Sequence, residues 1–270
     1  MKIILVTDTH LSPRAPAFNA NWAAARRWIA AEKAGAIVHL GDITADGADH
    51  PGELAFARRH FAGLDPAPHF VPGNHDIGDG PQRLAAYETY FGVCPWQFHA
   101  AGWLCIGLNT QLFGSGAEEE QFAFLSAALA ASPGRVALFL HKPLFRDGWD
   151  DADAHPGRYV PRAARLRLKA MLPPGRLGLV ASGHVHQARR LELDGAAHVW
   201  VPSTSFCIPD AVQEPLGRKM VGLAVLELGR DGVSSAFVAP EGMIRHNLME
   251  YDTVYPQLRS LDPALRRARL

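Results

Sequence analysis

Short continuous apolar runs recur along the chain, and they predict strands of a buried sheet. The first run covers residues 2–7, and it lacks the alternation of apolar and polar residues that a half-exposed strand would show. Similar runs lie at 36–40, 68–72, 135–140 and 177–180. We therefore expect these five segments to form the interior strands of the protein.

Segments with helical periodicity separate the first three strands. Apolar residues share one helical stripe over 18–29, with charged residues mostly elsewhere, and Gly35 ends this helix. A second helix begins at Pro51, a residue that suits the first turn, and extends to about Leu64. The resulting β-α-β-α-β order predicts parallel strands with right-handed crossovers. The carboxyl ends of these strands then share one edge of the sheet.

The later part of the chain contains strands in closer succession. Runs at 190–193 and 198–201 flank Asp194-Gly195, a dipeptide typical of hairpin turns, and 220–228 and 233–238 predict a second pair. We therefore expect an antiparallel second half that packs against the βαβ-rich first half. The remaining expected elements are helices at 80–91, 118–131 and 162–172, strands at 96–99 and 103–108, and an irregular segment at 143–161.

Composition and charge narrow the class of protein. The chain has 270 residues, of which 48% are hydrophobic, so we expect an α/β fold of two sheets in one domain over residues 1–270. Lys and Arg total 27, as do Asp and Glu, which makes a nucleic-acid or anionic-membrane partner unlikely. No apolar run reaches the length of a signal-peptide core or a membrane span, and three scattered cysteines favour reduced thiols, so we expect a cytoplasmic protein.

Polar clusters follow five of the predicted strands. In an α/β sheet, ligands bind outside the carboxyl ends of the strands, so we expect these clusters to converge on one pocket. Taken singly, an Asp or Asn at such a place could simply cap a turn. Five clusters in this arrangement make that explanation improbable for the set. The clusters are Asp8-Thr9-His10, Gly41-Asp42, Gly73-Asn74-His75-Asp76, His141 and Gly183-His184-Val185-His186.

The side chains in these clusters are ligands of the kind that transition metals prefer. Imidazole nitrogens and carboxylate or amide oxygens without thiolate suit Mn, Fe, Zn, Co or Ni rather than Ca. Asp42 offers two oxygens, enough to bridge two cations. Two such cations would hold a hydroxide and stabilise an in-line displacement at phosphorus, so the pattern favours phosphoester hydrolysis.

The order of these motifs resembles that of the calcineurin-like metallophosphoesterases. It is most similar to the branch of the class III cyclic nucleotide phosphodiesterases, which begins with Asp-x-His and ends with Gly-His-x-His, here Asp8 to His10 and Gly183 to His186. The resemblance implies a four-layer αββα sandwich of two mixed sheets flanked by helices. It also suggests a homodimer.

The resemblance further implies a role for each motif residue. Two metal ions, Mn, Fe or Zn, would be bound with Asp42 as the bridge. His75 would contact the phosphate and protonate the leaving oxygen without being a ligand, a role open to an imidazole near neutral pH. Asp76 would orient that histidine or a ligand. The first metal would take Asp8, His10, Asp42 and His186, and the second Asp42, Asn74, His141 and His184.

Three functions remain open at this point. The leading one is a phosphodiesterase that acts on small diesters, such as a cyclic nucleotide or a phospholipid-derived diester. A phosphomonoesterase or sugar-nucleotide pyrophosphatase would use the same ligands, and a non-catalytic scaffold would use only the fold. Substrate selection would come from the loop after His10, from 202–215 and from 143–161. The last segment is expected to form either a lid or rim, whose aromatic residues Phe145, Trp149 and Tyr159 stack on a base or other apolar group, or a solvated connection.

Overall fold

Two large mixed sheets form the centre of the protein. The computed structural model describes residues 1–270. The first sheet has five strands in the order β12-β11-β1-β2-β3. Strands β1, β2 and β3 are parallel, and β11 joins them by antiparallel pairing with β1. These strands are β1 (Lys2–Val6), β2 (Ala36–His39), β3 (His69–Phe70), β11 (Leu223–Leu228) and β12 (Val233–Val238).

The second sheet has six strands in the order β4-β5-β6-β7-β9-β8. Strands β5, β6, β7 and β9 are parallel, and each edge strand pairs antiparallel with its neighbour. The six strands are β4 (Trp96–Ala100), β5 (Trp103–Gly107), β6 (Arg135–Leu140), β7 (Leu177–Ser182), β8 (Arg189–Leu193) and β9 (Ala196–Trp200).

The prediction of an antiparallel second half is therefore wrong in part. Both hairpins are present, β8 with β9 and β11 with β12. However, β9 runs parallel to β7, and β11 returns to the first sheet, so the two halves of the chain do not correspond to the two sheets. Local hydrophobic patterns identify strands, whereas the partner of each strand depends on the path of the loops between them.

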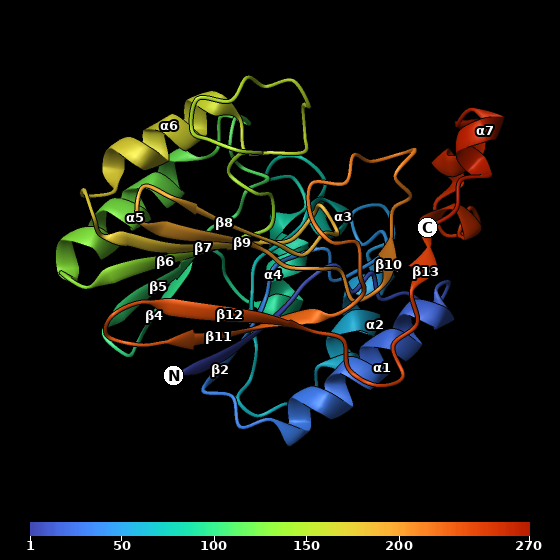
Figure 1. The fold of residues 1–270 in the computed structure, drawn as a ribbon, viewed down its shortest axis with the longest axis horizontal. Helices are drawn as coiled ribbons and strands as arrows, with labels where there is room; N and C mark the ends of the chain where they lie inside the picture. Colours follow the sequence, from blue (N-terminus) through green and yellow to red (C-terminus); the bar gives the residue numbers. More distant parts are fainter.

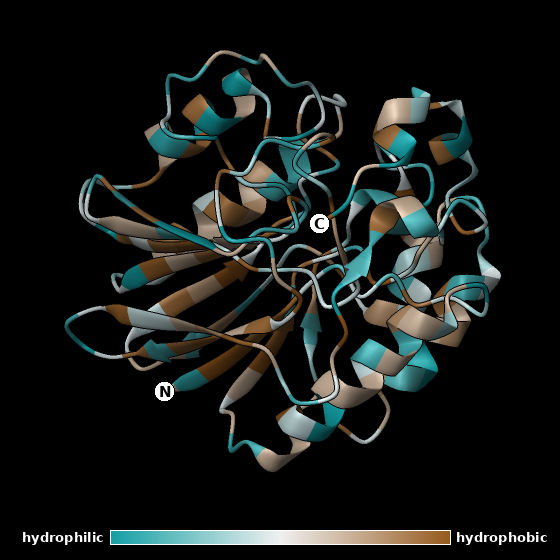
Figure 2. Ribbon diagram, turned by 45° about the vertical axis from the view of Figure 1, so that its right-hand side comes forward, coloured by the Kyte–Doolittle hydropathy of each residue, from teal (hydrophilic) through white to brown (hydrophobic).

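Helices cover the outer face of each sheet and complete four layers (Figure 1). The predicted αββα sandwich is confirmed. The outer faces are apolar like the inner ones, and the helices direct their apolar stripes toward them (Figure 2). Against the first sheet pack α1 (Pro16–Ala31), α2 (Gly52–His60) and α4 (Leu84–Phe91). Against the second pack α5 (Glu119–Ala131) and α6 (Arg162–Met171).

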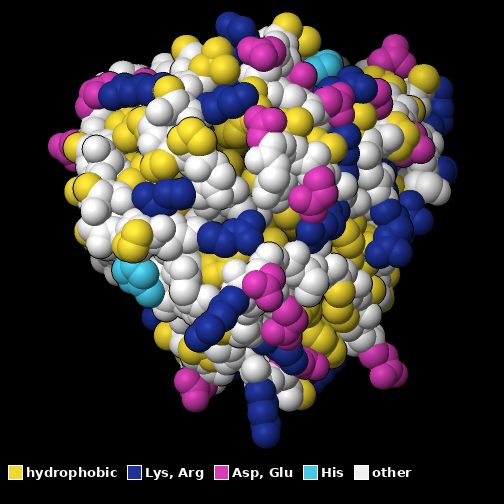
Figure 3. Space-filling view, turned by 60° about the vertical axis from the view of Figure 1, so that its left-hand side comes forward, with side chains coloured by type: hydrophobic (Ala, Val, Ile, Leu, Met, Phe, Trp, Pro, Cys, Tyr) yellow, Lys and Arg dark blue, Asp and Glu magenta, His cyan; other side chains and the backbone are white.

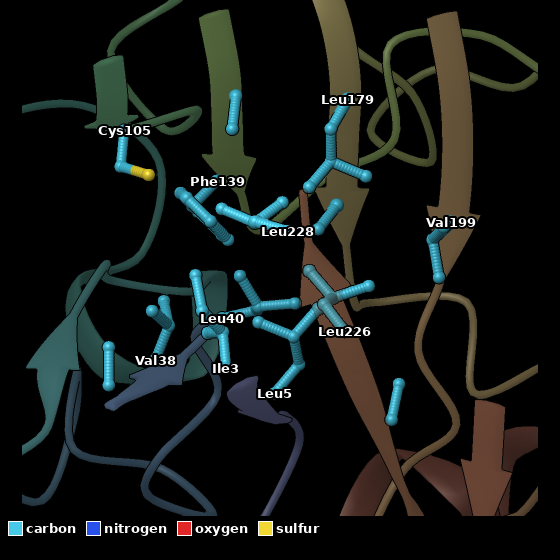
Figure 4. Packing of buried hydrophobic residues seen from close by; sticks show 14 of the residues in the cluster. Ile3, Leu5, Val38, Leu40, Cys105, Phe139, Leu179, Val199, Leu226 and Leu228 are labelled. Carbon is cyan, nitrogen blue, oxygen red and sulfur yellow. The ribbon is translucent and has the colours of Figure 1, made fainter. Parts of the chain in front are cut away.

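The space between the sheets is filled by a cluster of 20 buried residues (Figure 4). Leu5 of β1 and Phe139 of β6 are both fully buried in it, as the apolar runs predicted. At about 25 cal/mol per Å² of apolar surface, this burial is the main force that holds the sheets together. The strand ends that emerge from it are consequently well fixed in position.

A C-terminal segment returns to the ends of the strands. Strand β10 (Phe206–Cys207) pairs parallel with β13 (His246–Asn247), which places the last part of the chain beside α1 (Figure 1). Buried side chains of this part pack on Phe18 and Phe206. Its remaining elements are the 3₁₀ helices η1 (Leu248–Glu250) and η2 (Pro256–Ser260) and the short helix α7 (Pro263–Arg266).

The surface charges and the unpaired cysteines agree with what the sequence led us to expect. On the face shown in Figure 3, acidic and basic side chains are interspersed, as a net charge of zero leads one to expect. Cys94, Cys105 and Cys207 are buried and unpaired. None of the helices combines the length and the apolar character needed to cross a bilayer.

Candidate metal centre

The five polar clusters meet at one end of the two sheets. Each lies directly beyond a strand, and the inner core holds those strands side by side. The structure thus brings together side chains that are up to 178 positions apart, from Asp8 to His186. The donor atoms fall into three overlapping groups, within each of which all lie inside 4.8 Å: Asp8, His10 and His186; His10, Asp42 and His75; Asp42, His141 and His184.

The backbone at these clusters has an uncommon conformation. Seven residues other than glycine have a positive φ, and five of them carry side chains of the cluster. A left-handed conformation costs free energy for a residue with a Cβ, and it persists where the surrounding structure compensates that cost. Here it turns side chains back toward the strand ends. The five are Asp8 at 50°, His10 at 45°, Asp42 at 52°, His184 at 68° and His186 at 53°.

One carboxylate oxygen of Asp8 faces one ring nitrogen of His186. Asp8 Oδ2 accepts hydrogen bonds from Thr7 Oγ1 at 2.6 Å and from the His184 backbone N–H at 3.0 Å. Asp8 Oδ1 has no hydrogen-bond donor and lies 3.3 Å from His186 Nε2. The other ring nitrogen, Nδ1, lies 3.1 Å from the Phe206 carbonyl oxygen, to which it can only donate. In the neutral ring, His186 Nε2 is then the unprotonated nitrogen, and it is directed at a carboxylate.

His10, in the same donor group as Asp8 and His186, also has one ring nitrogen bonded and the other directed at carboxylates. Its Nδ1 lies 2.9 Å from Tyr255 Oη, while its Nε2 is buried without a partner. Nε2 lies 4.0 Å from Asp8 Oδ1 and 3.9 Å from Asp42 Oδ2. These separations are too long for hydrogen bonds but suit atoms that share one ion.

His141 occupies the centre of the second group. Its Nδ1 donates to the Leu40 carbonyl oxygen at 2.8 Å. Its Nε2 lies 3.3 Å from Asp42 Oδ2, 3.2 Å from Asn74 Oδ1 and 3.1 Å from His184 Nδ1. When His141 is neutral, four atoms that can bind a metal through a lone pair therefore lie together.

His184 and Asp42 complete the set. His184 Nε2 donates to the Gly157 carbonyl oxygen at 3.1 Å, which leaves Nδ1 directed toward His141. Asp42 Oδ1 accepts the backbone N–H of His75 at 2.8 Å. Asp42 Oδ2 remains, and it is the oxygen that approaches both His10 and His141. Asp42 thus has the position of a bridge between the two groups.

These residues fit two transition-metal ions. Buried lone pairs repel one another and lose their hydration. A cation among Asp8, His10 and His186 would satisfy Asp8 Oδ1 and His10 Nε2, which have no partner. A second cation would lie among Asp42, His141 and His184. Outer carbonyls and a hydroxyl already orient each imidazole, as is usual for histidine ligands of metals. The donors are nitrogen and oxygen atoms, a set that Mn, Fe and Zn accept.

The pKa shifts of the buried His and Asp side chains also indicate that this site favours a bound positive charge. Burial lowers the pKa of His141, but attraction to the Asp42 carboxylate and their hydrogen bond outweigh it and raise the pKa to about 9. Burial and the neighbouring His141 lower the pKa of His184 to about 3. Burial opposes ionisation of Asp8, yet the adjacent His186 holds the pKa of that carboxyl well below its usual range. When no metal is bound, protons supply the charge that the carboxylates demand.

His75 lies at the edge of the centre and lines the adjacent cavity. Its Nδ1 lies 2.7 Å from the Ala45 carbonyl oxygen, so the ring is held in one orientation. The rings of His75 and His10 are 4.8 Å apart. Because His75 also belongs to a donor group with His10 and Asp42, distances alone are compatible with both an acid and a ligand.

Asp76 has a structural position, and it does not contact the His75 ring. Its buried carboxylate accepts hydrogen bonds from the backbone N–H groups of Ile43, Thr44 and Gly73 and from the Thr44 hydroxyl. Burial and repulsion from Asp42 raise its pKa to about 6. Asp76 therefore fastens the loop that carries Asp42 to the turn that carries Asn74.

A cavity of about 240 Å³ opens beside His75 and His184. The expected lid aromatics do not line it: Phe145 and Trp149 are buried against His198 on the far side of their segment, and Tyr159 lies near Trp200. Only Arg158 of the irregular segment reaches the cavity. The predicted segment 202–215 does reach the cavity, through Phe206, Ile208 and Gln213. Sequence reasoning missed the C-terminal wall, because isolated apolar residues after a β-hairpin carry no motif. This wall consists of Leu248, Tyr255, Gln257 and Leu258.

Fold and donor set together place the chain among the metallophosphoesterases. The profile of the calcineurin-like phosphoesterases matches residues 1–188, and the chain belongs to that family. Serine/threonine-protein phosphatase CPPED1 of Danio rerio is 30% identical over 129 residues. This match covers 44% of the chain and 41% of the relative, so the chain spans about two fifths of the length of that curated protein.

Solved structures share the fold at low sequence identity. A dimetal phosphatase from Danio rerio has a TM-score of 0.57 and 17% identity, with 88% of this chain and 98% of that chain covered. GAP50 of Plasmodium has a TM-score of 0.66 and 13% identity over 96% and 94%. A purple acid phosphatase from yellow lupin has a TM-score of 0.64 and 13% identity over 91% and 52%.

Proposed function

We propose that this chain hydrolyses small phosphoesters, phosphodiesters first among them, at a centre of two transition-metal ions. The observation that carries the proposal is the orientation of the four imidazoles. Each has one ring nitrogen bonded to an outer carbonyl or hydroxyl, and the other within 4.8 Å of a carboxylate oxygen of Asp8 or Asp42. Asp8, His10, Asp42 and His186 would hold one ion, and Asp42, Asn74, His141 and His184 the other.

The remaining residues have roles that follow from their positions. When bound, the two ions would supply a hydroxide nucleophile near neutral pH and compensate the charge of the phosphate. His75, fixed by Ala45, would donate a proton to the leaving oxygen. The C-terminal wall would exclude water from one side of the reacting ester and contact its organic substituent.

The preference for diesters rests on the motif resemblance and on the apolar wall. A diester keeps an organic group on the oxygen that stays with phosphorus, and Phe206, Ile208 and Leu248 line the cavity where such a group can lie. Phosphomonoesters are the second candidate, because the curated relative is named a protein phosphatase. A scaffold role is the third, because a protein titled as an anchor of the inner membrane complex shares the fold.

One kinetic comparison separates these functions. Protein reconstituted with Mn is assayed on bis-p-nitrophenyl phosphate and on p-nitrophenyl phosphate, with a chelator-treated sample as control. We expect a higher kcat/KM on the diester and loss of activity after chelation. A preference for the monoester would favour the second candidate. Absence of turnover on both, with two ions bound per chain, would contradict the enzymatic proposal in favour of a scaffold.

A further inference from the structure

Arg158 is the only lysine or arginine that lines the cavity. It follows Gly157, whose carbonyl oxygen accepts the His184 Nε2–H bond at 3.1 Å. This bond fastens the segment to the metal centre and keeps Arg158 beside it. The side chain is half-buried, so its charge lies in a place of reduced solvent screening.

The Arg158 guanidinium has no protein anion as a partner, whereas its neighbours do. Arg146 pairs with Glu214 at 3.0 Å, and Arg162 pairs with Asp150 at 3.4 Å. The acidic residues of the same segment are engaged elsewhere as well. Asp151 accepts backbone N–H groups, and Asp153 accepts the backbone N–H of Arg162 and pairs with Arg165. The five donors of Arg158 are therefore available to a ligand.

The charge of the centre indicates what that ligand carries. Two divalent ions would be balanced by the carboxylates of Asp8 and Asp42, one hydroxide and one singly charged phosphodiester. The nearby Asp76 carboxylate is already bound by four hydrogen-bond donors of the protein. Arg158 would then add a positive charge without an anionic partner, and an anion stabilises a half-buried guanidinium. A guanidinium also matches phosphate oxygens with two parallel hydrogen bonds.

We propose that Arg158 binds a second negative charge on the substrate, in addition to the single charge of a phosphodiester. The proposal rests on the proposed phosphoesterase function and specifies its substrate class. The second charge has two sources: the dianionic phosphate of a monoester, or an anionic group on the substituent of a diester. Both present oxygen atoms to the same guanidinium, while the apolar wall contacts the uncharged part of the molecule.

Three chromogenic esters test the proposal at mildly alkaline pH. They are p-nitrophenyl phosphate, thymidine 5′-(p-nitrophenyl phosphate), and the latter compound with an additional 3′-phosphate. For Arg158→Ala we expect kcat/KM to fall about 10- to 100-fold on at least one of the two esters that carry more than one negative charge, and less than about threefold on the singly charged diester. Arg158→Lys should recover part of the loss, because it restores charge without the planar fork. The ester that responds identifies the source of the charge.

Arg162→Ala is the matched control. It removes the same charge close by in the chain, at the start of α6, but Arg162 pairs with Asp150 and does not line the cavity. We expect wild-type rates on all three esters. An equal loss on all three with Arg158→Ala, no loss on either of the two esters with more than one charge, or the same pattern with Arg162→Ala would overturn the proposal.

A binding measurement keeps this test separate from the proposed function. Calorimetry on the metal-loaded proteins compares inorganic phosphate, thymidine 3′,5′-bisphosphate and dimethyl phosphate, with metal content measured in parallel. Arg158→Ala should weaken at least one of the first two about tenfold or more, leave dimethyl phosphate unchanged and retain both ions. If no ester is hydrolysed, the enzymatic proposal fails, and the binding comparison still decides whether Arg158 recognises a second charge.

Discussion

For three of the four proposed histidine ligands, one backbone carbonyl decides which ring nitrogen can bind a metal. Leu40, Phe206 and Gly157 each accept one ring N–H, so the opposite nitrogen keeps its lone pair. A histidine without such a partner would exchange between two tautomers, and only one of them can bind an ion. The acceptors therefore raise the fraction of competent ligand before any metal arrives.

Tyr255 fills this role for His10, and its removal gives a first prediction. Tyr255→Phe takes away the hydroxyl that lies 2.9 Å from His10 Nδ1 while keeping the buried ring. Because outer partners of metal ligands typically contribute 10- to 100-fold to affinity, we expect the weaker of the two Mn sites to lose about that factor. Competition with a coloured chelator measures it. Tyr251→Phe is the control, and an equal effect there would contradict the assignment.

His75 and Asp42 should respond differently to replacement by alanine. Without the proposed general acid, His75→Ala should lower kcat about 10²- to 10⁴-fold, most strongly for poor leaving groups, and should keep both ions. Asp42→Ala should lose metal, because the shared oxygen faces both groups. Elemental analysis of the purified variants checks this. Loss of an ion in the His75 variant would show that His75 is a ligand.

At the scale of elements, the turns after the strands are as important as the strands. Gly73 and Gly183 lie where a neighbouring ligand loop passes closely: a Cβ on Gly73 would overlap the Asp42 carboxylate, and one on Gly183 would overlap Thr7 Oγ1 and approach Asp8 Oδ2 at 2.8 Å. Asp76 adds hydrogen bonds between two of these turns. The ligand positions thus depend on contacts between loops.

Two glycine variants test the tight packing of these turns. Gly183→Ala should displace Asp8, and we expect it to weaken metal binding at least tenfold and to lower the free energy of unfolding by about 1–3 kcal/mol, as overpacking commonly does. Gly52→Ala lies in α2 with no atom near its added methyl group, so it should be neutral or stabilising by less than about 1 kcal/mol. Denaturant unfolding and metal titration of both variants make the comparison. Unchanged metal binding in the Gly183 variant would refute the packing argument.

The C-terminal segment gives the centre its particular surroundings. Residues 248–258 supply one wall of the cavity and the Tyr255 hydroxyl, and they lie beyond residues 1–188, where the family profile matches. The shared part of the chain thus carries the proposed ligands, and the later part shapes the space for the substrate. Differences in specificity between relatives of this chain are expected to map to that later part and to the segment around Arg158.

For the molecule as a whole, two apolar layers outside the sheets add to the inner core. His198 of β9 is buried in one of them, against Phe145 at 4.6 Å between ring centroids, and its Nε2 has no partner. Burial lowers the pKa of His198 to about 4 from its ordinary 6.5. A proton is therefore taken up on unfolding at intermediate pH.

This burial predicts how stability depends on pH. Because the folded pKa is depressed, the contribution of His198 is fully present above pH 6.5 and is lost as the pH falls toward 4. The full shift corresponds to about 3 kcal/mol. His198→Gln should flatten the curve of unfolding free energy between those limits, measured by urea denaturation in a pH series. His99→Gln, at an exposed position, should leave the curve unchanged, and an unaltered slope in the His198 variant would contradict the argument.

The strands and the identity of the clustered residues could be predicted because both depend on local sequence. A buried strand such as 2–7 is recognisable from its own side chains, and a residue directly after it lies at its end wherever the strand is placed. The predicted role of the aromatic residues of 143–161 is wrong for the opposite reason. Phe145 and Trp149 are apolar enough to stack on a ligand or to pack in a core, and only the neighbouring strand and α6 decide between these outcomes.

The sequence by itself determined the layered α/β fold and the set of polar side chains at the strand ends, because hydrophobic periodicity and chain order act over a few residues. The tertiary structure decided the order of the strands, the bonds that orient each imidazole, and the wall formed by Tyr255 and its neighbours. It also decided that Arg158, the arginine that lines the cavity, has no anionic partner in the protein. These features join segments far apart in the chain, and their geometry depends on how two sheets pack rather than on any local preference.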